Sequence, residues 1–406
     1  MDTIYDRPLA EREAFLHYNS AISAWIFSVF LLILIGVSLP AQAGKPEGKG
    51  GGKPPSGSTQ NLPVRLGLPS GCSSSEGYGM NDGALASGQL VVVGMGFCSN
   101  PFNKPVRWQN GTWTDVFSYS VNGVATDASN DSPGQAGKAT VVGWTAGNGY
   151  FEFVQPPGSA PVQLPRLAAT TQVGCQGLRI NRSGDRITGC VNGPGPSFDN
   201  VYGVRWSLNN PGGWQAESLG LNFYPRAISD DGSVIVGNVD EQAKLWLALP
   251  GGGGEFISLG NGFVEDISFS PNGGKSILVG YRAQPCSGSC TWYPVPVYWT
   301  ESASGWTRHD LSALDGVDSE AMAVANANGK LVIVGWGYTR KDAIQRAVAW
   351  IPDANGNYGQ PVRLDAIDGR SKSWARAVDV NGNGVVLGAS AVSGLRQEAV
   401  LWILPK

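Results

Sequence analysis

Apolar and polar positions recur along residues 62–404 as seven similar units. In each unit a turn leads into a run of β-branched and apolar residues that ends on glycine, and a second apolar stretch follows. Short apolar runs between turn residues are typical of β-strands. The run-ending glycines are Gly94, Gly143, Gly189, Gly237, Gly280, Gly335 and Gly388. Six units close the second stretch on tryptophan, at Trp108, Trp206, Trp246, Trp299, Trp350 and Trp402, whereas the second unit has Phe151–Val154 there.

Each unit predicts four strands. The first is short and leads into a tight turn such as Asp231-Gly232 or Asn383-Gly384, whose residues tolerate positive φ angles. The second is the run that ends on glycine, which permits a bend or the close approach of another backbone. The third ends on tryptophan, a side chain large enough to fill the space between neighbouring sheets. A short fourth strand follows, as in Phe256–Leu259.

Units of 43 to 55 residues with four strands match the period of β-propeller blades. We therefore predict an all-β, seven-bladed β-propeller over residues 62–406. The chain ends on a third strand, Glu398–Trp402, whereas Leu62–Leu68 resembles the fourth strand Gln360–Leu364. The N-terminal strand is thus expected to pair with the last blade and close the ring, which leaves only short edges.

The first 43 residues have the layout of a secretory signal. An uncharged apolar stretch is followed by Pro40 and by Ala41-Gln42-Ala43, a cleavage site of small residues. The alternative is a retained N-terminal membrane anchor, because the leader is long and not basic. Residues 44–61 contain almost no apolar side chains and are expected to form a flexible Gly/Pro/Lys linker. Both alternatives export the propeller, so we expect a secreted, periplasmic or cell-surface protein of a bacterium.

Composition narrows the classes of partner. Glycine is abundant, at 57 of 406 residues, and only 15% of residues are charged, which favours many turns over long helices. The net charge of −3 predicts neither nucleic-acid binding nor electrostatic attachment to a membrane. We expect a monomer that contacts a membrane only through the N-terminal segment if that segment is uncleaved.

Two segments carry a resemblance to a known family. Arg226–Gly237 reads RAISDDGSVIVG and Ala347–Trp350 reads AVAW. This combination resembles the HAF-type repeat of bacterial extracellular proteins, and the resemblance covers about residues 62–404. It implies export and a propeller-like fold, and it implies no catalytic residues.

All six cysteines lie in the exported part, where an oxidising compartment favours disulfides. Because each pair falls within one unit, we predict the disulfides Cys72–Cys98, Cys175–Cys190 and Cys286–Cys290. A metal site at these cysteines is disfavoured, since the chain lacks Cys-x-x-Cys pairs and partner histidines.

Catalytic and metal motifs are sparse. His17 lies in the export segment, so His309, in an expected fourth strand, is the only histidine left for a Ser-His-Asp triad, and we interpret it as an edge-strand residue. Asp379, Asn381 and Asn383 match the start of a calcium loop. Ser390 stands where the loop needs its bidentate acid, so a hairpin turn is favoured there over calcium. We therefore predict no cofactor and no metal.

The expected innermost strands carry the candidate binding residues Arg179, Arg226, Glu265, Asp266, Glu320 and Arg376. These charges would either line a central channel and hold a polar or sugar-like ligand, or pair with one another. The sequence favours a non-enzymatic binding or scaffold module that acts on a glycan, a surface polymer or a protein. The alternative is a carbohydrate-active hydrolase or lyase that uses carboxylates on one face of the ring.

Overall fold

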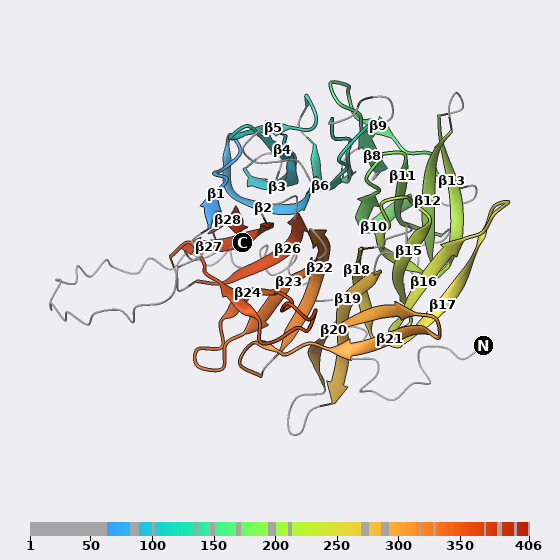
Figure 1. Cartoon of the computed structure of the whole chain (residues 1–406). Helices are drawn as coiled ribbons and strands as arrows, with labels where there is room; N and C mark the ends of the chain where they lie inside the picture. The colour runs from blue at the N-terminus through green and yellow to red at the C-terminus, as the bar shows by residue number, and fades with distance from the viewer. Residues whose placement is uncertain are drawn as a thin grey trace, which may run out of the picture. The chain divides into compact units, whose positions relative to one another are not determined.

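Seven four-stranded antiparallel sheets are arranged in a ring (Figure 1). The computed structural model describes residues 63–81, 89–99, 102–119, 121–132, 135, 138–146, 151–167, 172–193, 200–209, 213–268, 276–285, 292–316, 318–327, 330–368, 371–379, 384–393 and 396–404. The predicted seven-bladed β-propeller is confirmed. Within the described ranges, the one element that is not a strand is the 3-10 turn η4 (Leu314–Gly316), and no helix is long and apolar enough to cross a membrane.

The strands follow one another outward in each sheet. Sheet 1 contains β2 (Cys72–Met80), β3 (Val92–Cys98), β4 (Asn103–Gln109) and β5 (Thr112–Asp115); sheet 2 contains β6 (Asn122–Ala128), β7 (Val141–Ala146), β8 (Phe151–Gln155) and β9 (Val162–Gln163). Sheet 3 contains β10 (Gln172–Ile180), β11 (Arg186–Asn192), β12 (Val201–Asn209) and β13 (Gly213–Leu221); sheet 4 contains β14 (Tyr224–Ile228), β15 (Val234–Val239), β16 (Gln242–Ala248) and β17 (Gly254–Asn261).

Sheet 5 contains β18 (Phe263–Ser268), β19 (Ile277–Pro285), β20 (Trp292–Ser302) and β21 (Gly305–Asp310); sheet 6 contains β22 (Ser319–Ala327), β23 (Lys330–Tyr338), β24 (Gln345–Trp350) and β25 (Val362–Leu364). Sheet 7 contains β26 (Ser373–Asp379), β27 (Val385–Ser393), β28 (Arg396–Ile403) and β1 (Val64–Arg65). The first-named strand of every sheet contacts the first-named strand of both neighbouring sheets, so these seven strands form the inner wall of the ring.

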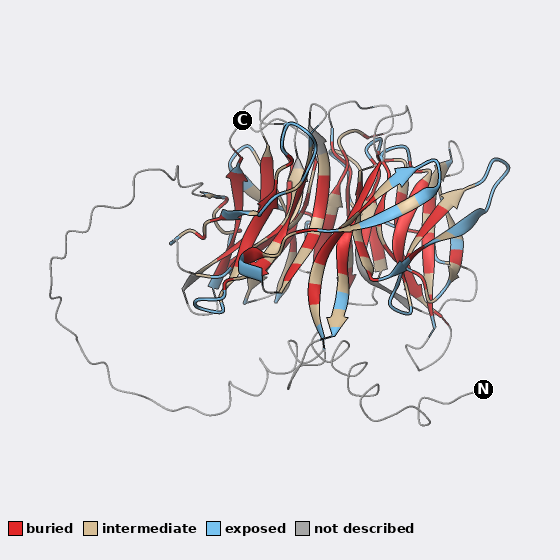
Figure 2. Cartoon of the chain, turned by 60° about the horizontal axis from the view of Figure 1, so that its bottom comes forward, coloured by how far each residue is buried: buried red, intermediate tan, exposed pale blue. Residues whose placement is uncertain are grey.

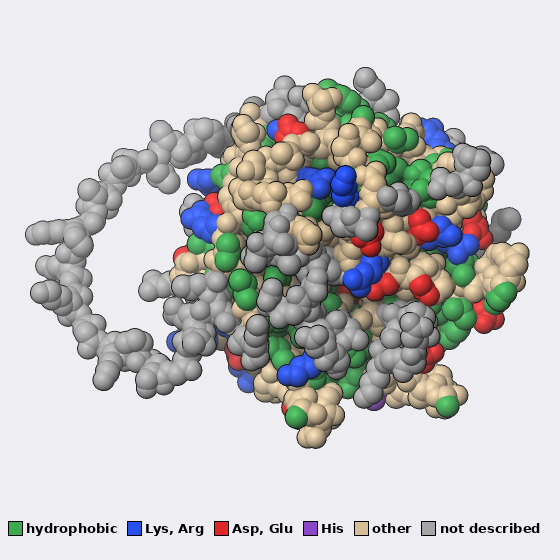
Figure 3. Space-filling view, turned by 45° about the horizontal axis from the view of Figure 1, so that its top comes forward, with side chains coloured by type: hydrophobic (Ala, Val, Ile, Leu, Met, Phe, Trp, Pro, Cys, Tyr) green, Lys and Arg blue, Asp and Glu red, His purple; other side chains and the backbone are tan. Residues whose placement is uncertain are grey.

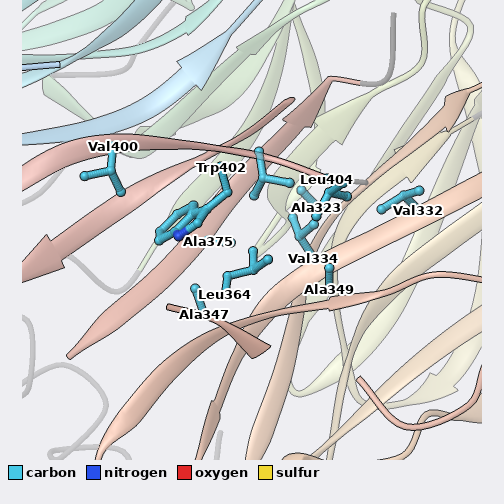
Figure 4. Packing of buried hydrophobic residues seen from close by; sticks show 11 residues of the cluster. Ala323, Val332, Val334, Ala347, Ala349, Leu364, Ala375, Val400, Trp402 and Leu404 are labelled. Carbon is cyan, nitrogen blue, oxygen red and sulfur yellow. The ribbon is translucent and has the colours of Figure 1, made fainter. Parts of the chain in front are cut away.

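Apolar side chains fill the space between neighbouring sheets. Each of the seven interfaces has its own buried cluster, and most residues of these clusters are fully buried (Figure 2). Between sheets 6 and 7, Trp402 and Val400 of β28 meet Leu364 and the alanines of β24 (Figure 4). Burial of this apolar surface is the main stabilising contribution to the ring.

The third-strand tryptophans also link the sheets through hydrogen bonds. The indole Nε1–H of Trp402 donates to the carbonyl of Asp365 at 2.8 Å, and that of Trp350 donates to Ser312 at 2.8 Å. Trp206 and Trp299 make the same bond, to Pro165 and Leu259. In all four cases the acceptor lies at or just after the outermost strand of the preceding sheet, so one side chain supplies both packing and register.

The run-ending glycines have a specific steric role. A Cβ added at Gly94, Gly143, Gly237, Gly280, Gly335 or Gly388 would collide with a carbonyl oxygen of the paired innermost strand. These oxygens belong to Glu76, Val124, Tyr224, Phe263, Glu320 and Trp374. The prediction that this glycine permits a close backbone approach is therefore confirmed in six sheets. Gly189 differs, because its neighbours are the side chains of Leu178 and Trp206 at 3.3 Å.

The N-terminal residues supply the outermost strand of the last sheet. β1 pairs antiparallel with β28, with Val64 opposite Leu401. The Arg65 guanidinium pairs with Glu398, and Leu66 is buried between sheets 7 and 1. That this two-residue strand holds the ring closed stays a prediction.

One predicted disulfide is present, and a cysteine of a second predicted pair is also disulfide-bonded. Cys72 of β2 is bonded to Cys98 of β3, 26 residues away in the chain. Cys190 is also disulfide-bonded, and the backbone register puts Cys175 opposite it. Cys286 and Cys290 lie outside the described residues. A cross-link within one sheet stabilises the fold by limiting the freedom of the unfolded chain.

The first testable consequence concerns the glycine contact. We expect Gly280→Ala to lower the free energy of unfolding by about 1–3 kcal/mol, since the new methyl group would displace the backbone of β18. Thermal unfolding followed by circular dichroism measures this change. Gly359→Ala is the matched control, because a Cβ there meets no atom within 4 Å. Equal melting temperatures for the two variants would contradict the steric role.

A second variant tests the N-terminal segment. We expect Leu66→Ala to cost about 2–5 kcal/mol, because it removes a buried side chain from the interface between sheets 7 and 1. Val64→Ala, at a side chain that is 45% exposed, should cost much less. Denaturant unfolding of both variants gives the comparison. A Leu66→Ala variant as stable as the wild type would show that the first strand contributes little to ring closure.

Candidate functional site

β-Bulges at one level of the inner wall present a set of side chains to the ring interior. In six sheets the pairing of the two innermost strands shifts by one residue, next to the run-ending glycine. The extra residues are Tyr78, Thr126, Arg226, Glu265, Met322 and Arg376. A bulge redirects a side chain without ending the strand. The same backbone device therefore presents a different chemical group in each sheet.

Charged side chains from sheets that are not neighbours interact with one another. Glu320 of sheet 6 interacts electrostatically with Arg226 of sheet 4, and Arg376 of sheet 7 interacts with Glu265 of sheet 5. Such pairs skip a sheet, so their side chains must converge on the interior of the ring. We name Glu76, Arg226, Glu265, Glu320 and Arg376 the inner charge cluster.

Glu76 anchors the cluster between sheets 7 and 1. Its carboxylate is almost fully buried and accepts hydrogen bonds from Trp374 Nε1 at 3.1 Å and from Arg376 Nη2 at 2.8 Å. Gln397 Nε2 and the Tyr78 hydroxyl donate to its other oxygen, at 3.1 and 3.2 Å. The Arg376 guanidinium lies 4.8 Å from the centre of the Tyr78 ring, a cation–π contact. These bonds fix Arg376 in one orientation.

The two arginines of the cluster remain accessible. Arg226 Nε lies 3.9 Å from Glu265 Oε2, a long ion pair in which the arginine side chain is 31% exposed. The Arg376 side chain is 33% exposed although it is held by Glu76. Burial alone would lower the pKa of Arg376, but the attraction of Glu76 and Tyr78 outweighs it and raises the pKa. Arginine side chains are charged at neutral pH, and both guanidinium groups carry N–H donors for a ligand.

Glu320 lies partly buried near the start of β22. Burial, and after it the negative charge of Glu265, raise the pKa of Glu320 to about 8. A hydrogen bond from Trp336 and the charges of Arg226 and Arg376 act in the opposite direction without cancelling the effect. At neutral pH this carboxyl group is mostly protonated and is able to donate a hydrogen bond.

A second group of charges links neighbouring sheets. Asp127 Oδ2 accepts the backbone N–H of Ile180 at 3.1 Å, and Asp266 Oδ2 accepts that of Val324 at 2.8 Å. Each aspartate thus reaches from the innermost strand of one sheet to that of the next. Burial raises the pKa of Asp266 to about 7, although the backbone amides and Arg179 act against it. We interpret this group as structural.

All six candidate residues predicted from the sequence lie on innermost strands. Arg226, Glu265, Glu320 and Arg376 converge in the inner charge cluster, whereas Arg179 and Asp266 belong to the group that contains Asp127. Some of these charges pair with one another, as the alternative interpretation expected. Whether they bind a ligand stays a prediction.

Sequence reasoning missed Glu76, Tyr78 and Asp127. Glu76 and Tyr78 stand in a Ser/Gly-rich segment, and the hairpins between the first two strands differ in length from unit to unit. A fixed spacing from the run-ending glycine therefore does not locate them. These residues could have been located from the bulge that lies beside each run-ending glycine. Finding the bulge requires the register of the two strands, which the sequence alone does not provide.

Other predicted sites have a mixed outcome. His309 lies on the outermost strand β21, as expected, where it stacks on Tyr298 and its Nε2 lies 3.0 Å from Thr300 Oγ1. Asn381 and Asn383 lie outside the described residues, so the calcium alternative stays untested. Among the side chains that the structure describes, no three His, Cys, Asp or Glu residues are grouped to hold a metal ion.

Among the described side chains in Figure 3, no large area carries a single charge. Lys and Arg side chains alternate with Asp and Glu side chains on that face, among hydrophobic and uncharged ones. A polyanion such as nucleic acid needs an extended positive surface. The described side chains of this face do not form such a surface.

Comparison with known proteins supports the fold. No family model matches the sequence, and the search of curated proteins finds no match. Among solved structures, an oligogalacturonate lyase in complex with manganese is similar, with a TM-score of 0.52 and 14% identity over 84% of this chain and 93% of the other. The β-propeller domain of the Trilobed protease from Pyrococcus furiosus has a TM-score of 0.43 and 11% identity over 70% of this chain and 82% of the other. At 14% identity the likeness to the lyase concerns the fold and not the activity.

The raised pKa of Glu320 gives a prediction about pH. The folded protein binds the Glu320 proton more tightly than the unfolded chain, whose pKa is near 4.5. Stability from this group is thus full below about pH 4.5 and is lost as the pH rises through about 8. Glu320→Gln mimics the protonated form and should remove this loss.

The measurement is the melting temperature of wild type and Glu320→Gln between pH 5 and pH 9. As the pH rises, we expect the melting temperature of the variant to rise relative to that of the wild type. At pH 9 this difference corresponds to a free energy of unfolding higher by on the order of 1 kcal/mol. Glu217→Gln, at an outer ion pair with Arg205, is the control for loss of one negative charge. Parallel curves for Glu320→Gln and wild type would contradict the raised pKa.

Proposed function

We propose that this protein is an exported binding module whose inner charge cluster holds a glycan without catalysing a reaction. The observation that carries the proposal is the convergence of Arg226, Glu265, Glu320 and Arg376 from four sheets. Binding residues placed on a rigid scaffold keep their geometry when the ligand arrives, which lowers the entropic cost of binding.

The chemistry of the cluster suits hydroxyl groups. A sugar hydroxyl donates one hydrogen bond and accepts others, and the cluster provides both kinds of partner. Arg226 and Arg376 are donors, the Glu265 carboxylate is an acceptor, and protonated Glu320 does both. Aromatic rings, among them Tyr78 and Trp336, lie beside these charges. A few polar groups beside aromatic rings are typical of sites for small polar ligands.

Export is supported by two independent features. The first 43 residues have the layout of a secretory signal, and Cys72 and Cys98 form a disulfide. Disulfides persist in oxidising compartments such as the periplasm and the cell exterior. The resemblance to HAF-type repeats implies the same location. Surface polymers and proteins are the other partners that this location offers.

A second candidate function is a carbohydrate-active hydrolase or lyase. The observation in its favour is Glu320, a carboxyl group with a pKa of about 8 next to the carboxylate of Glu265. Two carboxyl groups whose pKa values are pushed apart are a known arrangement for acid and base catalysis. If the protein is an enzyme of this class, it releases new reducing ends or unsaturated products from a polysaccharide, and Glu320→Gln abolishes that release.

Ligand binding is tested by isothermal titration of residues 44–406, with the disulfides intact, against oligosaccharides of β-1,4-glucose, β-1,4-N-acetylglucosamine and α-1,4-galacturonate. We expect one series to bind and Arg226→Gln to weaken that binding by about tenfold, the cost of one charge-assisted hydrogen bond. Arg282→Gln is the matched control, because Arg282 pairs with Asp310 on an outer strand.

The same samples separate the outcomes. Binding that Arg226→Gln reduces and Arg282→Gln does not would support the proposal. Equal binding by all three proteins would place the ligand elsewhere, and no binding in any series would overturn the glycan assignment. Product release during the titration would favour the enzyme.

A further inference from the structure

Exposed aromatic side chains gather at one end of the sheets. In the part of the chain that the structure describes, five aromatic residues are exposed, and four of them are at this end: Phe102, Tyr119, Tyr224 and Trp292. The fifth, Phe256, lies on the outermost strand β17, where its ring packs edge-on against Phe223 with 5.0 Å between ring centres. Single exposed aromatic residues are common on proteins, but their concentration at one end is informative.

The strand directions show that this is the end at which the innermost strands begin, close to Arg226, Glu265 and Glu320 of the inner charge cluster. Tyr224 is the first residue of β14, two positions before Arg226. Trp292 begins β20 opposite Pro285, where β19 extends beyond the start of β18. Phe102 follows β3, whose last residue Cys98 pairs with the first residue of β2.

The aromatic residues form two groups on opposite sides of the ring. Phe102 belongs to sheet 1, and Tyr119 lies in the segment between β5 and β6. The N–H of Asn103 donates to Asn122 Oδ1 at 3.2 Å, which holds these two connections together. Tyr224 and Trp292 belong to sheets 4 and 5. Sheet 4 is three positions from sheet 1 around the ring of seven, and sheet 5 is three positions from sheet 1 in the other direction. The two groups therefore lie on opposite sides of the ring, with the inner charge cluster between them.

We infer that this end of the ring binds an extended polysaccharide chain rather than a single sugar unit. The chain stacks on Tyr119 and Phe102 at one side and on Tyr224 and Trp292 at the other. The sugars in between hydrogen-bond to Arg226, Glu320 and Arg376. This inference rests on the proposed glycan binding, and it adds that several sugar units contribute to affinity.

The spacing of the aromatic residues favours a polysaccharide over a protein partner. A protein interface needs a continuous apolar centre with a polar rim, whereas here charged groups occupy the centre and aromatic rings the periphery. A sugar ring has apolar C–H faces and a polar edge. The faces can stack on the aromatic side chains at the two sides, and the hydroxyl groups can bond to the charged groups between them.

Chain length provides the test. Dissociation constants are measured by isothermal titration for the disaccharide, tetrasaccharide and octasaccharide of β-1,4-glucose, β-1,4-N-acetylglucosamine and α-1,4-galacturonate, with residues 44–406. We expect the octasaccharide of one series to bind at least about tenfold more tightly than its disaccharide, because a longer chain reaches both aromatic groups at once. Equal affinity at all three lengths would overturn the inference and leave the glycan proposal intact.

Two variants locate the added affinity. Tyr119→Ala and Trp292→Ala should each weaken octasaccharide binding by about threefold to tenfold, the contribution of one stacking contact, and leave disaccharide binding unchanged. Phe256→Ala is the control, since Phe256 is about as exposed as Trp292 but lies on the outermost strand β17, away from the two aromatic groups. An octasaccharide that binds both variants as tightly as the wild type would overturn the inference. Failure of every oligosaccharide to bind any protein would overturn the inference together with the proposed function.

Discussion

The contact between a glycine and a backbone carbonyl is the constraint on which the rest of the structure depends. In six of the seven sheets the innermost strand carries a bulge that drives a carbonyl oxygen against the second strand, and glycine alone leaves room for it. The glycine that marks each unit in the sequence is therefore the mark of the bulge. Because the bulge redirects one side chain, the same contact that shapes the sheet also positions Arg226, Glu265 and Arg376.

The links between sheets reuse a few side-chain types at equivalent positions. Tryptophans on the third strands pack between sheets and donate to carbonyls of the preceding sheet, and Asp127 and Asp266 accept amides of the following sheet. Buried polar groups of this kind cost little when every bond is made and much when one is missing. The ring is thus held by apolar packing between the sheets and by hydrogen bonds both at its outer strands and at its inner wall.

Much of the fold was predictable from the sequence because the features that repeat are those that the fold requires. The Val-Gly runs and the tryptophans gave the number of sheets, and the pairing of Cys72 with Cys98 followed from their place in one unit. The site was predictable only in part. Which sheet each charge belongs to follows from the repeat, but convergence depends on the bulge register, and hairpins of unequal length hide that register. Glu76 and Tyr78 were missed for this reason, and the raised pKa of Glu320 depends on neighbours from three other sheets.

One structural position, the bulge residue, is occupied in six sheets by five kinds of side chain: tyrosine, threonine, glutamate, methionine and, in two sheets, arginine. The glycine opposite it stays the same, so the backbone does not depend on which side chain stands there. Duplicated units can in this way diverge one interior group at a time without loss of folding. A ring of this kind offers evolution a set of independently exchangeable positions around one axis, and ligand preference can change while the architecture is inherited unchanged.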